Sequence, residues 1–206
     1  RGQYGAGDDT HAYRNEDGVD PNSITVTFVA AKLMFDNYRW SGVPFYVRTG
    51  KKLADKFTRI DVVFKKPLID IFANPRMKSE QSLNSNVLTI FVEPNSGFSL
   101  RLNAKRAGQG FTTEPVDLKY LQSDEAKNES PEPYERLFHD ALEGNHTNFA
   151  SWAEIAYAWK FVDVIRKLWD IEEPQFPNYT PGSMGPAASD ELLARDGRQW
   201  VYHLNH

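Results

Sequence analysis

The chain contains no cysteine among its 206 residues, so neither a disulfide nor thiolate chemistry is available to it. It has no signal-like start and no apolar run of 18 residues, which argues against export and against a membrane span. No pair of histidines, and no histidine with acidic residues, has the spacing of a metal site. These absences predict a soluble, cytoplasmic protein that binds neither a membrane nor a metal ion.

The sequence also lacks a G-x-G-x-x-G motif between a strand and a helix, so no dinucleotide-binding fold is predicted. The formal net charge is -4, and nucleic-acid binding usually requires a basic face, so we expect no nucleic-acid partner. Hydrophobic residues make up 40% of the chain, which is enough for a substantial core. The length allows one large domain or two small ones, and no internal linker favours two.

Polar and apolar side chains alternate between about residues 23 and 122, a pattern typical of antiparallel strands with one buried face. The pattern begins at Ile24, Val26 and Phe28 and recurs at Leu88, Ile90, Val92, Leu100, Leu102, Val116, Leu118 and Tyr120. The short connection over residues 93–97 fits a hairpin, so we predict a meander of about six strands. The polar segment 1–22, which contains Gly2, Gly5 and Gly7, predicts an irregular, flexible loop.

The period becomes helical over about residues 131–172. Pro133 suits the first turn of a helix and Gly144 suits its end. Ser151 and Glu154 can form a capping box for a second helix. Both helices carry an apolar stripe that we expect to be buried, and the tail over 173–206 is irregular apart from a short helix near Asp190 to Arg195. Strands followed by helices predict an α+β fold, in which a large, mostly antiparallel sheet carries the helices on one face.

The segment 43–57, VPFYVRTGKKLADKF, joins an apolar strand to a group of cations. Gly50 can adopt turn conformations that other residues avoid, so the strand is expected to end there. Lys51 and Lys56 then follow on a loop at a strand end, where compact ammonium groups suit a phosphate or a sugar phosphate. A solvated basic turn is the alternative interpretation of the same residues.

The same segment closely resembles a signature of the glucose-6-phosphate dehydrogenase family. Other stretches fit that family in the same order along the chain: RGQYG at 1–5, RWSGVPF at 39–45, VEPN at 92–95, PYERL at 133–137 and YTPGSMG at 179–185. The resemblance covers essentially the whole sequence, which corresponds to the C-terminal part of that two-domain enzyme. The sequence starts at Arg1 without a methionine, and we expect a preceding segment to carry the Rossmann domain.

The resemblance implies that residues 1–206 form a substrate-binding and dimerisation domain. It implies that Lys51 and Lys56 contact glucose 6-phosphate, and that the protein is a homodimer or a tetramer. The full enzyme would oxidise glucose 6-phosphate to the lactone with NADP, or with NAD, as part of the pentose phosphate pathway of glucose metabolism. The coenzyme would be bound mainly by the N-terminal domain.

The family's catalytic histidine lies in a motif similar to R-I-D-H-Y-L-G-K, which this sequence does not contain; the nearest string is RIDV at 59–62. We therefore expect the fragment to be inactive by itself. Some family members hold a second, structural NADP. Where they have an arginine this chain has Phe91, although Arg101 and Lys105 remain compatible with that site. The alternative is a non-catalytic module that binds a sugar phosphate or mediates dimerisation.

Overall fold

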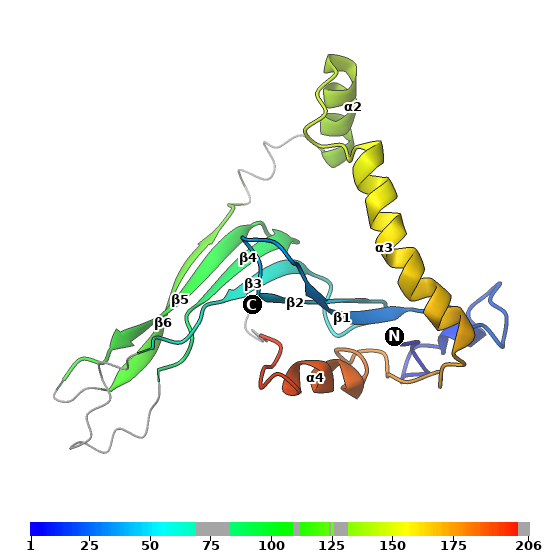
Figure 1. Cartoon of the computed structure of the whole chain (residues 1–206), viewed down its shortest axis with the longest axis horizontal. Helices are drawn as coiled ribbons and strands as arrows, with labels where there is room; N and C mark the ends of the chain where they lie inside the picture. The colour runs from blue at the N-terminus through cyan, green and yellow to red at the C-terminus, as the bar shows by residue number, and fades with distance from the viewer. Residues whose placement is uncertain (69–82, 109–111, 124, 126–131, 202–206) are drawn as a thin grey trace. The chain divides into compact units, whose positions relative to one another are not determined.

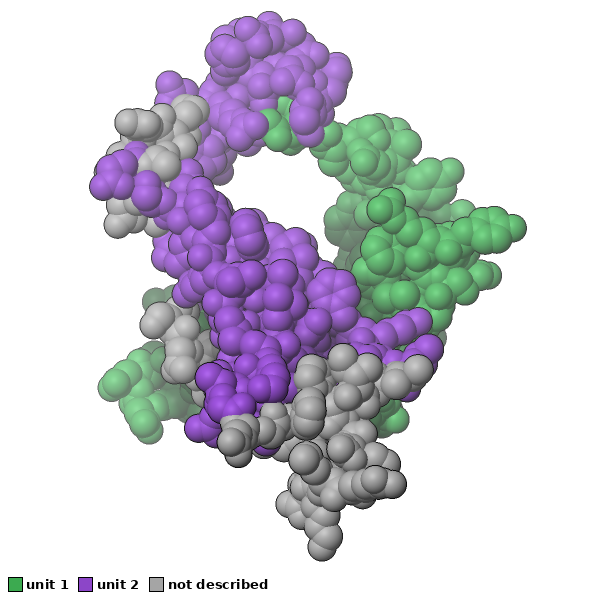
Figure 2. Space-filling model, turned by 90° about the vertical axis from the view of Figure 1, so that its left-hand side faces the viewer, with its two compact units in different colours: residues 1–55, 148–206 green, residues 56–147 purple. Residues whose placement is uncertain are grey.

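The computed structural model describes residues 1–201 except 69–82, 109–111, 124 and 126–131. These residues form two compact units (Figure 2). Unit 1 comprises Arg1–Asp55 and Asn148–His206, and unit 2 comprises Lys56–Thr147. Antiparallel strands come first along the chain and helices come later (Figure 1), so the predicted α+β class is confirmed.

Unit 1 contains a two-stranded sheet, in which β1 (Phe28–Met34) pairs with β2 (Pro44–Gly50) in antiparallel register. Phe28 lies opposite Gly50, and Met34 lies opposite Pro44. The predicted strand start at Ile24 was wrong, because the main chain before Phe28 bonds elsewhere. The Gln3 side-chain amide donates to the carbonyls of Ser23 and Thr25, at 3.0 and 2.9 Å.

The core of unit 1 is built around the first residues of the chain. Gln3 is fully buried, and Tyr4, Phe28 and Tyr179 form a buried aromatic cluster. The main chain secures this arrangement, since Gly2 donates to Phe28 at 2.7 Å and Gly5 donates to Tyr179 at 2.8 Å. The expectation of a flexible loop over residues 1–22 was therefore wrong at its start, although a polar stretch with one 3-10 turn, η1 (Tyr13–Asn15), follows.

Unit 2 contains a four-stranded antiparallel sheet of β3 (Thr58–Val63), β4 (Val87–Glu93), β5 (Gly97–Lys105) and β6 (Thr113–Leu121), paired in that order. The expected hairpin over residues 93–97 joins β4 to β5. The six described strands form two sheets, whereas we expected one meander. The chain between β2 and β3 makes no hairpin, because its main-chain groups bond to residues 27, 182 and 183.

The two faces of the four-stranded sheet differ in chemistry. Residues directly opposite one another on paired strands share a face. One face therefore carries two apolar rows, Ile60–Ile90–Phe98–Tyr120 and Val62–Leu88–Leu100–Leu118. The other carries the row Asp61–Thr89–Ser99–Lys119 and the pair Arg101–Asp117. Many apolar side chains remain exposed: Leu118 is 54% exposed and Tyr120 57%.

The helix boundaries follow the predicted caps. Helix α2 (Pro133–Glu143) begins with Pro133 and ends before Gly144, which has a φ of 69°. Helix α3 (Trp152–Ile171) begins with the predicted capping box, since the Glu154 N–H donates to the Ser151 hydroxyl and the Ser151 N–H donates to the Glu154 carboxylate. Helix α4 (Ala187–Ala194) covers most of the predicted short helix.

The helices differ in how they pack. Helix α4 contacts β1, as expected for a helix on a sheet. No residue of α3 is buried, and Trp159 remains 53% exposed, so the expected burial of its apolar stripe is not seen. The described helices include none with the length and hydropathy that a membrane span requires.

The packing around Phe28 generates a stability prediction. Gly182 and Gly185 both have a positive φ, of 78° and 108°, but only at Gly185 would a Cβ overlap the Phe28 ring. Gly182→Ala should lower the free energy of unfolding by about 1–2 kcal/mol through backbone strain. Gly185→Ala should cost about 1–3 kcal/mol more because of overpacking. Urea unfolding of the two variants checks this, and equal losses would contradict the clash with Phe28.

Candidate functional site

The loop after β2 carries the first predicted substrate residue, Lys51. Gly50 ends β2, but its φ is not positive, so its predicted conformational role was wrong. Gly50 is required for space, because a Cβ there would lie 2.6 Å from the Phe28 ring. The positive φ falls on Lys52, at 52°, which is uncommon for a residue with a side chain.

Four main-chain groups of this loop are bonded to other parts of unit 1. The Lys51 N–H donates to the Thr27 carbonyl at 2.9 Å, and the Tyr179 hydroxyl donates to the Lys51 carbonyl at 2.9 Å. Two further bonds of 2.9 Å join the loop to the motif at 179–185: Gly182 donates to the Lys52 carbonyl, and Ala54 donates to the Ser183 carbonyl. The main chain of the loop is therefore held on both sides of Lys51.

The tyrosines behind the loop are in their neutral form at neutral pH. Burial and a hydrogen bond to Glu16 raise the pKa of Tyr4 to about 12. Burial also raises the pKa of Tyr179, which is 7% exposed. Both hydroxyl groups therefore keep the proton that they donate.

The Lys51 and Lys56 side chains point to the chemistry of the site. Both residues are exposed. In the part of the chain that the structure describes, neither ammonium group has a hydrogen-bond or ion-pair partner. Lys51 belongs to unit 1 and Lys56 is the first residue of unit 2. An exposed, unpaired ammonium on an anchored main chain can bind an anionic group.

Arg48, the cation within β2, has a structural role. Its guanidinium lies 4.4 Å from the centre of the Trp200 ring. From the same hairpin, the Tyr46 hydroxyl and the Lys32 ammonium donate hydrogen bonds to Asp196. These two hydrogen bonds lower the pKa of Asp196, and the bond from Lys32 has the larger effect. The group ties residues 196–200 to the β1–β2 hairpin.

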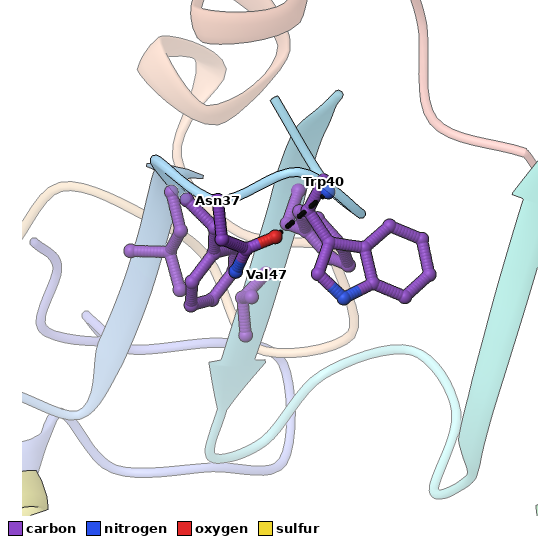
Figure 3. Close-up of a pocket in the computed structure, with 6 residues that line it drawn as sticks. Asn37, Trp40 and Val47 are labelled. Atoms are coloured by element: carbon purple, nitrogen blue, oxygen red, sulfur yellow. Dashed lines mark hydrogen bonds between the residues drawn. The ribbon is translucent and has the colours of Figure 1, made fainter. Parts of the chain in front are cut away.

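An apolar pocket of about 520 Å³ lies in unit 1 at the loop between β1 and β2 (Figure 3). It is lined by Leu33, Phe35, Asn37, Trp40, Phe45 and Val47. The Asn37 side chain accepts from the Trp40 N–H, so its oxygen orders the loop. The lining residue nearest to Gly50 along β2 is Val47, three residues away, which is about 10 Å at 3.4 Å per residue. No residue of the Lys51 loop lines this pocket.

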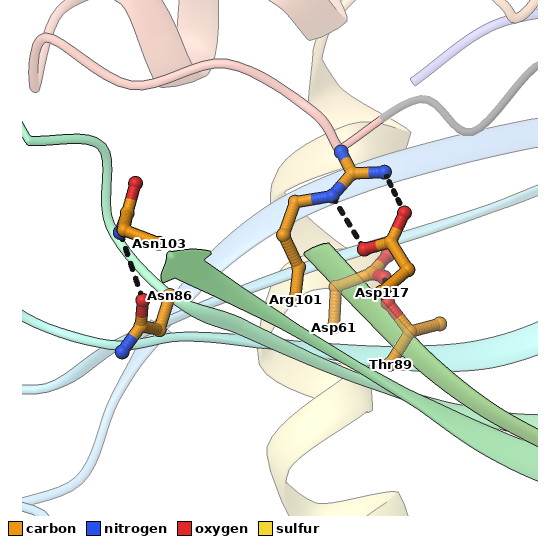
Figure 4. Close-up of polar contacts among 6 residues, drawn as sticks. All are labelled: Asp61, Asn86, Thr89, Arg101, Asn103 and Asp117. Carbon is orange, nitrogen blue, oxygen red and sulfur yellow. Dashed lines mark hydrogen bonds and ion pairs between the residues drawn. The ribbon is translucent and has the colours of Figure 1, made fainter. Parts of the chain in front are cut away.

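The polar face of the unit 2 sheet is occupied by internal bonds (Figure 4). Arg101 donates to the two carboxylate oxygens of Asp117 at 2.7 and 2.8 Å, and this pairing raises the pKa of Arg101. Thr89 donates to Asp61 at 2.7 Å, and Lys105 donates to the Gly108 carbonyl at 3.2 Å. Arg101 and Lys105, the two residues that are compatible with a second, structural NADP, are thus both bonded within unit 2, and Phe91 lies on the same sheet.

Sequence reasoning named the lysines and missed the groups that hold their loop. Tyr179, Gly182 and Ser183 lie in the string YTPGSMG, to which the sequence alone assigns no role. This string was the one signal in the sequence that could have indicated their importance. Its adjacency to the loop could not be read from the sequence, because Lys51 and Tyr179 are 128 residues apart.

Comparisons with known proteins identify the family of the chain. Residues 1–201 match the family model "Glucose-6-phosphate dehydrogenase, C-terminal domain". The chain is 47% identical over 204 residues to a glucose-6-phosphate 1-dehydrogenase of Bacillus subtilis and 46% identical over 204 residues to that of Leuconostoc mesenteroides. A solved structure of a glucose-6-phosphate dehydrogenase in complex with glucose-6-phosphate matches 98% of the chain with a TM-score of 0.82 and 31% identity.

These matches cover the chain almost completely but only part of each relative. The match to the Bacillus subtilis enzyme covers 97% of this chain and 41% of that enzyme. The match to the Leuconostoc mesenteroides enzyme covers 98% of this chain and 41% of that enzyme, and the chain spans 41% of the solved structure. A Mycobacterium avium enzyme, 24% identical with a TM-score of 0.74 and 40% covered, supports the same fold. The chain belongs to the glucose-6-phosphate dehydrogenase family, of which it represents the C-terminal domain.

Proposed function

We propose that this chain is the C-terminal part of a cytoplasmic, NADP-dependent glucose-6-phosphate dehydrogenase. In that reaction C1 of the sugar is oxidised to the lactone, and a hydride passes to the nicotinamide. The chain contributes one wall of the sugar-phosphate pocket, and the coenzyme is bound mainly by residues outside it. The observation that best supports this proposal is the anchored loop at Lys51, because it presents an unpaired cation from a fixed main chain.

Lys51 and Lys56 are proposed to contact glucose 6-phosphate. The substrate carries a phosphate, and a charge-assisted hydrogen bond to a phosphate oxygen is stronger than a neutral one. Both lysines are exposed, so binding does not require an existing ion pair to break. The two positions fit the spacing of the basic residues that the family uses at this loop. The interpretation as a solvated turn fails if either lysine proves specific for the phosphorylated sugar.

In the full-length enzyme, Lys51→Ala and Lys56→Ala should each lower kcat/KM for glucose 6-phosphate roughly 10- to 150-fold, from a contact of about 1.5–3 kcal/mol. The adjacent Lys52→Ala is the matched control, since it removes the same charge from the same loop. The KM for NADP should change little in all three variants. Steady-state kinetics with both substrates tests this.

The phosphate contact has a direct test of its own. For whichever lysine holds the phosphate, the loss in kcat/KM should shrink when free glucose replaces glucose 6-phosphate. If both variants lose equal activity on the two sugars, neither lysine recognises the phosphate, and the substrate assignment fails.

The chain by itself should show no dehydrogenase activity. It lacks the histidine motif for general-base removal of the hydroxyl proton. We expect no rise in the absorbance of reduced nicotinamide when the 206-residue chain is mixed with glucose 6-phosphate and NADP, whereas the full-length protein should turn over. A full-length protein that binds the sugar phosphate without turnover would instead support the non-catalytic module.

Homodimerisation is proposed to involve the apolar face of the unit 2 sheet. The rows Ile60–Ile90–Phe98–Tyr120 and Val62–Leu88–Leu100–Leu118 lie on one face, and no described helix of that unit covers them. Exposed apolar patches of more than several hundred Å² are unusual on a monomer. Permanent homodimer interfaces are large and apolar, which this face suits.

Sedimentation of the 206-residue chain should show a dimer, and Leu118→Asp should shift it toward monomer by placing a charge on the apolar face. Ser99→Asp is the control, because Ser99 lies on the opposite, polar face of the same sheet. A wild-type chain that stays monomeric over a wide concentration range would refute the proposal.

A further inference from the structure

The buried hydroxyl of Tyr179 is the one side-chain group seen to bond the Lys51 main chain in the described structure. Its oxygen lies 2.9 Å from the Lys51 carbonyl, 3.0 Å from the Thr27 hydroxyl and 3.2 Å from the Thr27 carbonyl. A phenol has one proton to donate and lone pairs that accept. The proton can therefore serve one carbonyl well, and the shorter distance selects that of Lys51.

The donor directions around Thr27 support this assignment. The Tyr4 N–H donates to the Thr27 hydroxyl oxygen at 3.1 Å. Thr27 can then donate its own proton to the Tyr179 oxygen, which leaves the Tyr179 proton for Lys51. The result is a directed series of bonds from Tyr4 through Thr27 and Tyr179 to Lys51. Each member is buried or partly buried, where such bonds strengthen one another.

This series of hydrogen bonds ends at Lys51, whose side-chain direction matters for substrate binding. Lys51 is held at its N–H by Thr27 and at its carbonyl by Tyr179, so the direction of its Cα–Cβ bond is fixed. The next residue, Lys52, has its uncommon φ of 52° and is held there by Gly182. A long lysine side chain loses conformational entropy when it binds a ligand. A main chain that is already fixed loses little more, so the total entropy cost of binding is smaller.

We propose that Tyr179 is a positioning residue for the sugar-phosphate site. Its hydroxyl group, through the Lys51 carbonyl, holds the Lys51 ammonium in the place where it meets the substrate. The proposal rests on the proposed function, since it assigns to Lys51 the contact with glucose 6-phosphate. It gives the motif at 179–185 a role in substrate affinity as well as in the core of unit 1.

The test uses Tyr179→Phe in the full-length enzyme, which removes the hydroxyl and keeps the ring between Tyr4 and Phe28. We expect KM for glucose 6-phosphate to rise roughly fivefold, the effect of one ordinary hydrogen bond, with kcat and the KM for NADP nearly unchanged. Tyr4→Phe is the matched control: it is the same substitution in the same cluster, it keeps the Tyr4 N–H that donates to Thr27, and it removes only the hydroxyl that donates to Glu16 at 3.1 Å. It should leave KM unchanged.

A double-mutant cycle separates positioning from a general structural effect. In a Lys51→Ala background the ammonium is already absent, so Tyr179→Phe should no longer raise KM. A rise in KM of the same size with and without Lys51 would overturn the proposal, and so would an equal rise in Tyr4→Phe.

Hydrogen exchange gives a readout that does not depend on the reaction. The amides of residues 50–54 should exchange faster in Tyr179→Phe than in the wild type, and Tyr4→Phe should leave them unchanged. Unchanged exchange in Tyr179→Phe overturns the positioning role whatever the substrate is. A wild-type enzyme that does not oxidise glucose 6-phosphate overturns the proposed function instead, and the exchange result then decides the positioning role alone.

Discussion

The hydrogen bonds that join Tyr4, Thr27 and Tyr179 are the constraint on which unit 1 depends. They bring together three segments that are 23 and 152 residues apart in sequence. Loop closure over such separations costs conformational entropy, so the contact must be strong in itself. Here apolar and polar contributions coincide: the rings of Tyr4, Phe28 and Tyr179 pack edge to face or tilted, and their polar groups are bonded within the same cluster.

The same cluster determines how closely the surrounding main chain can approach. Phe28 lies against Gly50 on one side and Gly185 on another, and a Cβ at either position would meet its ring. Because both glycines are packed against one side chain, the end of β2 and the motif at 179–185 are held near each other. The lysine loop lies between them and is bonded to both. A core contact of ordinary size thus fixes the geometry of an exposed loop.

Local patterns predicted local structure well. The alternation at Leu88–Val92 and Val116–Tyr120 identified β4 and β6, and the caps at Gly144 and Ser151 marked helix ends. Such signals depend on residues close in sequence, so periodicity and capping chemistry are sufficient. For the site, the sequence indicated the two lysines and the family. The individual roles of Lys51 and Lys56 are proposals, because the family comparison does not test single residues.

What failed depended on distant contacts. Gly2–Tyr4 was interpreted as flexible because three glycines in a polar stretch usually mark a loop, yet pairing with Phe28 and Tyr179 buries it. The division into two sheets was missed, since partners at residues 182 and 183 take the main chain that a hairpin would have used. The function of Gly50 was misassigned for the same reason, because its neighbour Phe28 cannot be inferred from local sequence.

The distribution of burial agrees with the coverage of the relatives. Among described residues the buried hydrophobic side chains are Tyr4, Phe28, Leu83, Tyr179 and Leu193, while no residue of α3 is buried. A helix that is apolar on most sides is normally buried, and a chain of this size ordinarily buries much more. The chain spans 41% of the Bacillus subtilis enzyme. Exposed apolar surface on α3 and on the unit 2 sheet is therefore what a domain would present if its stability depended on further protein, from the same polypeptide or from a second copy.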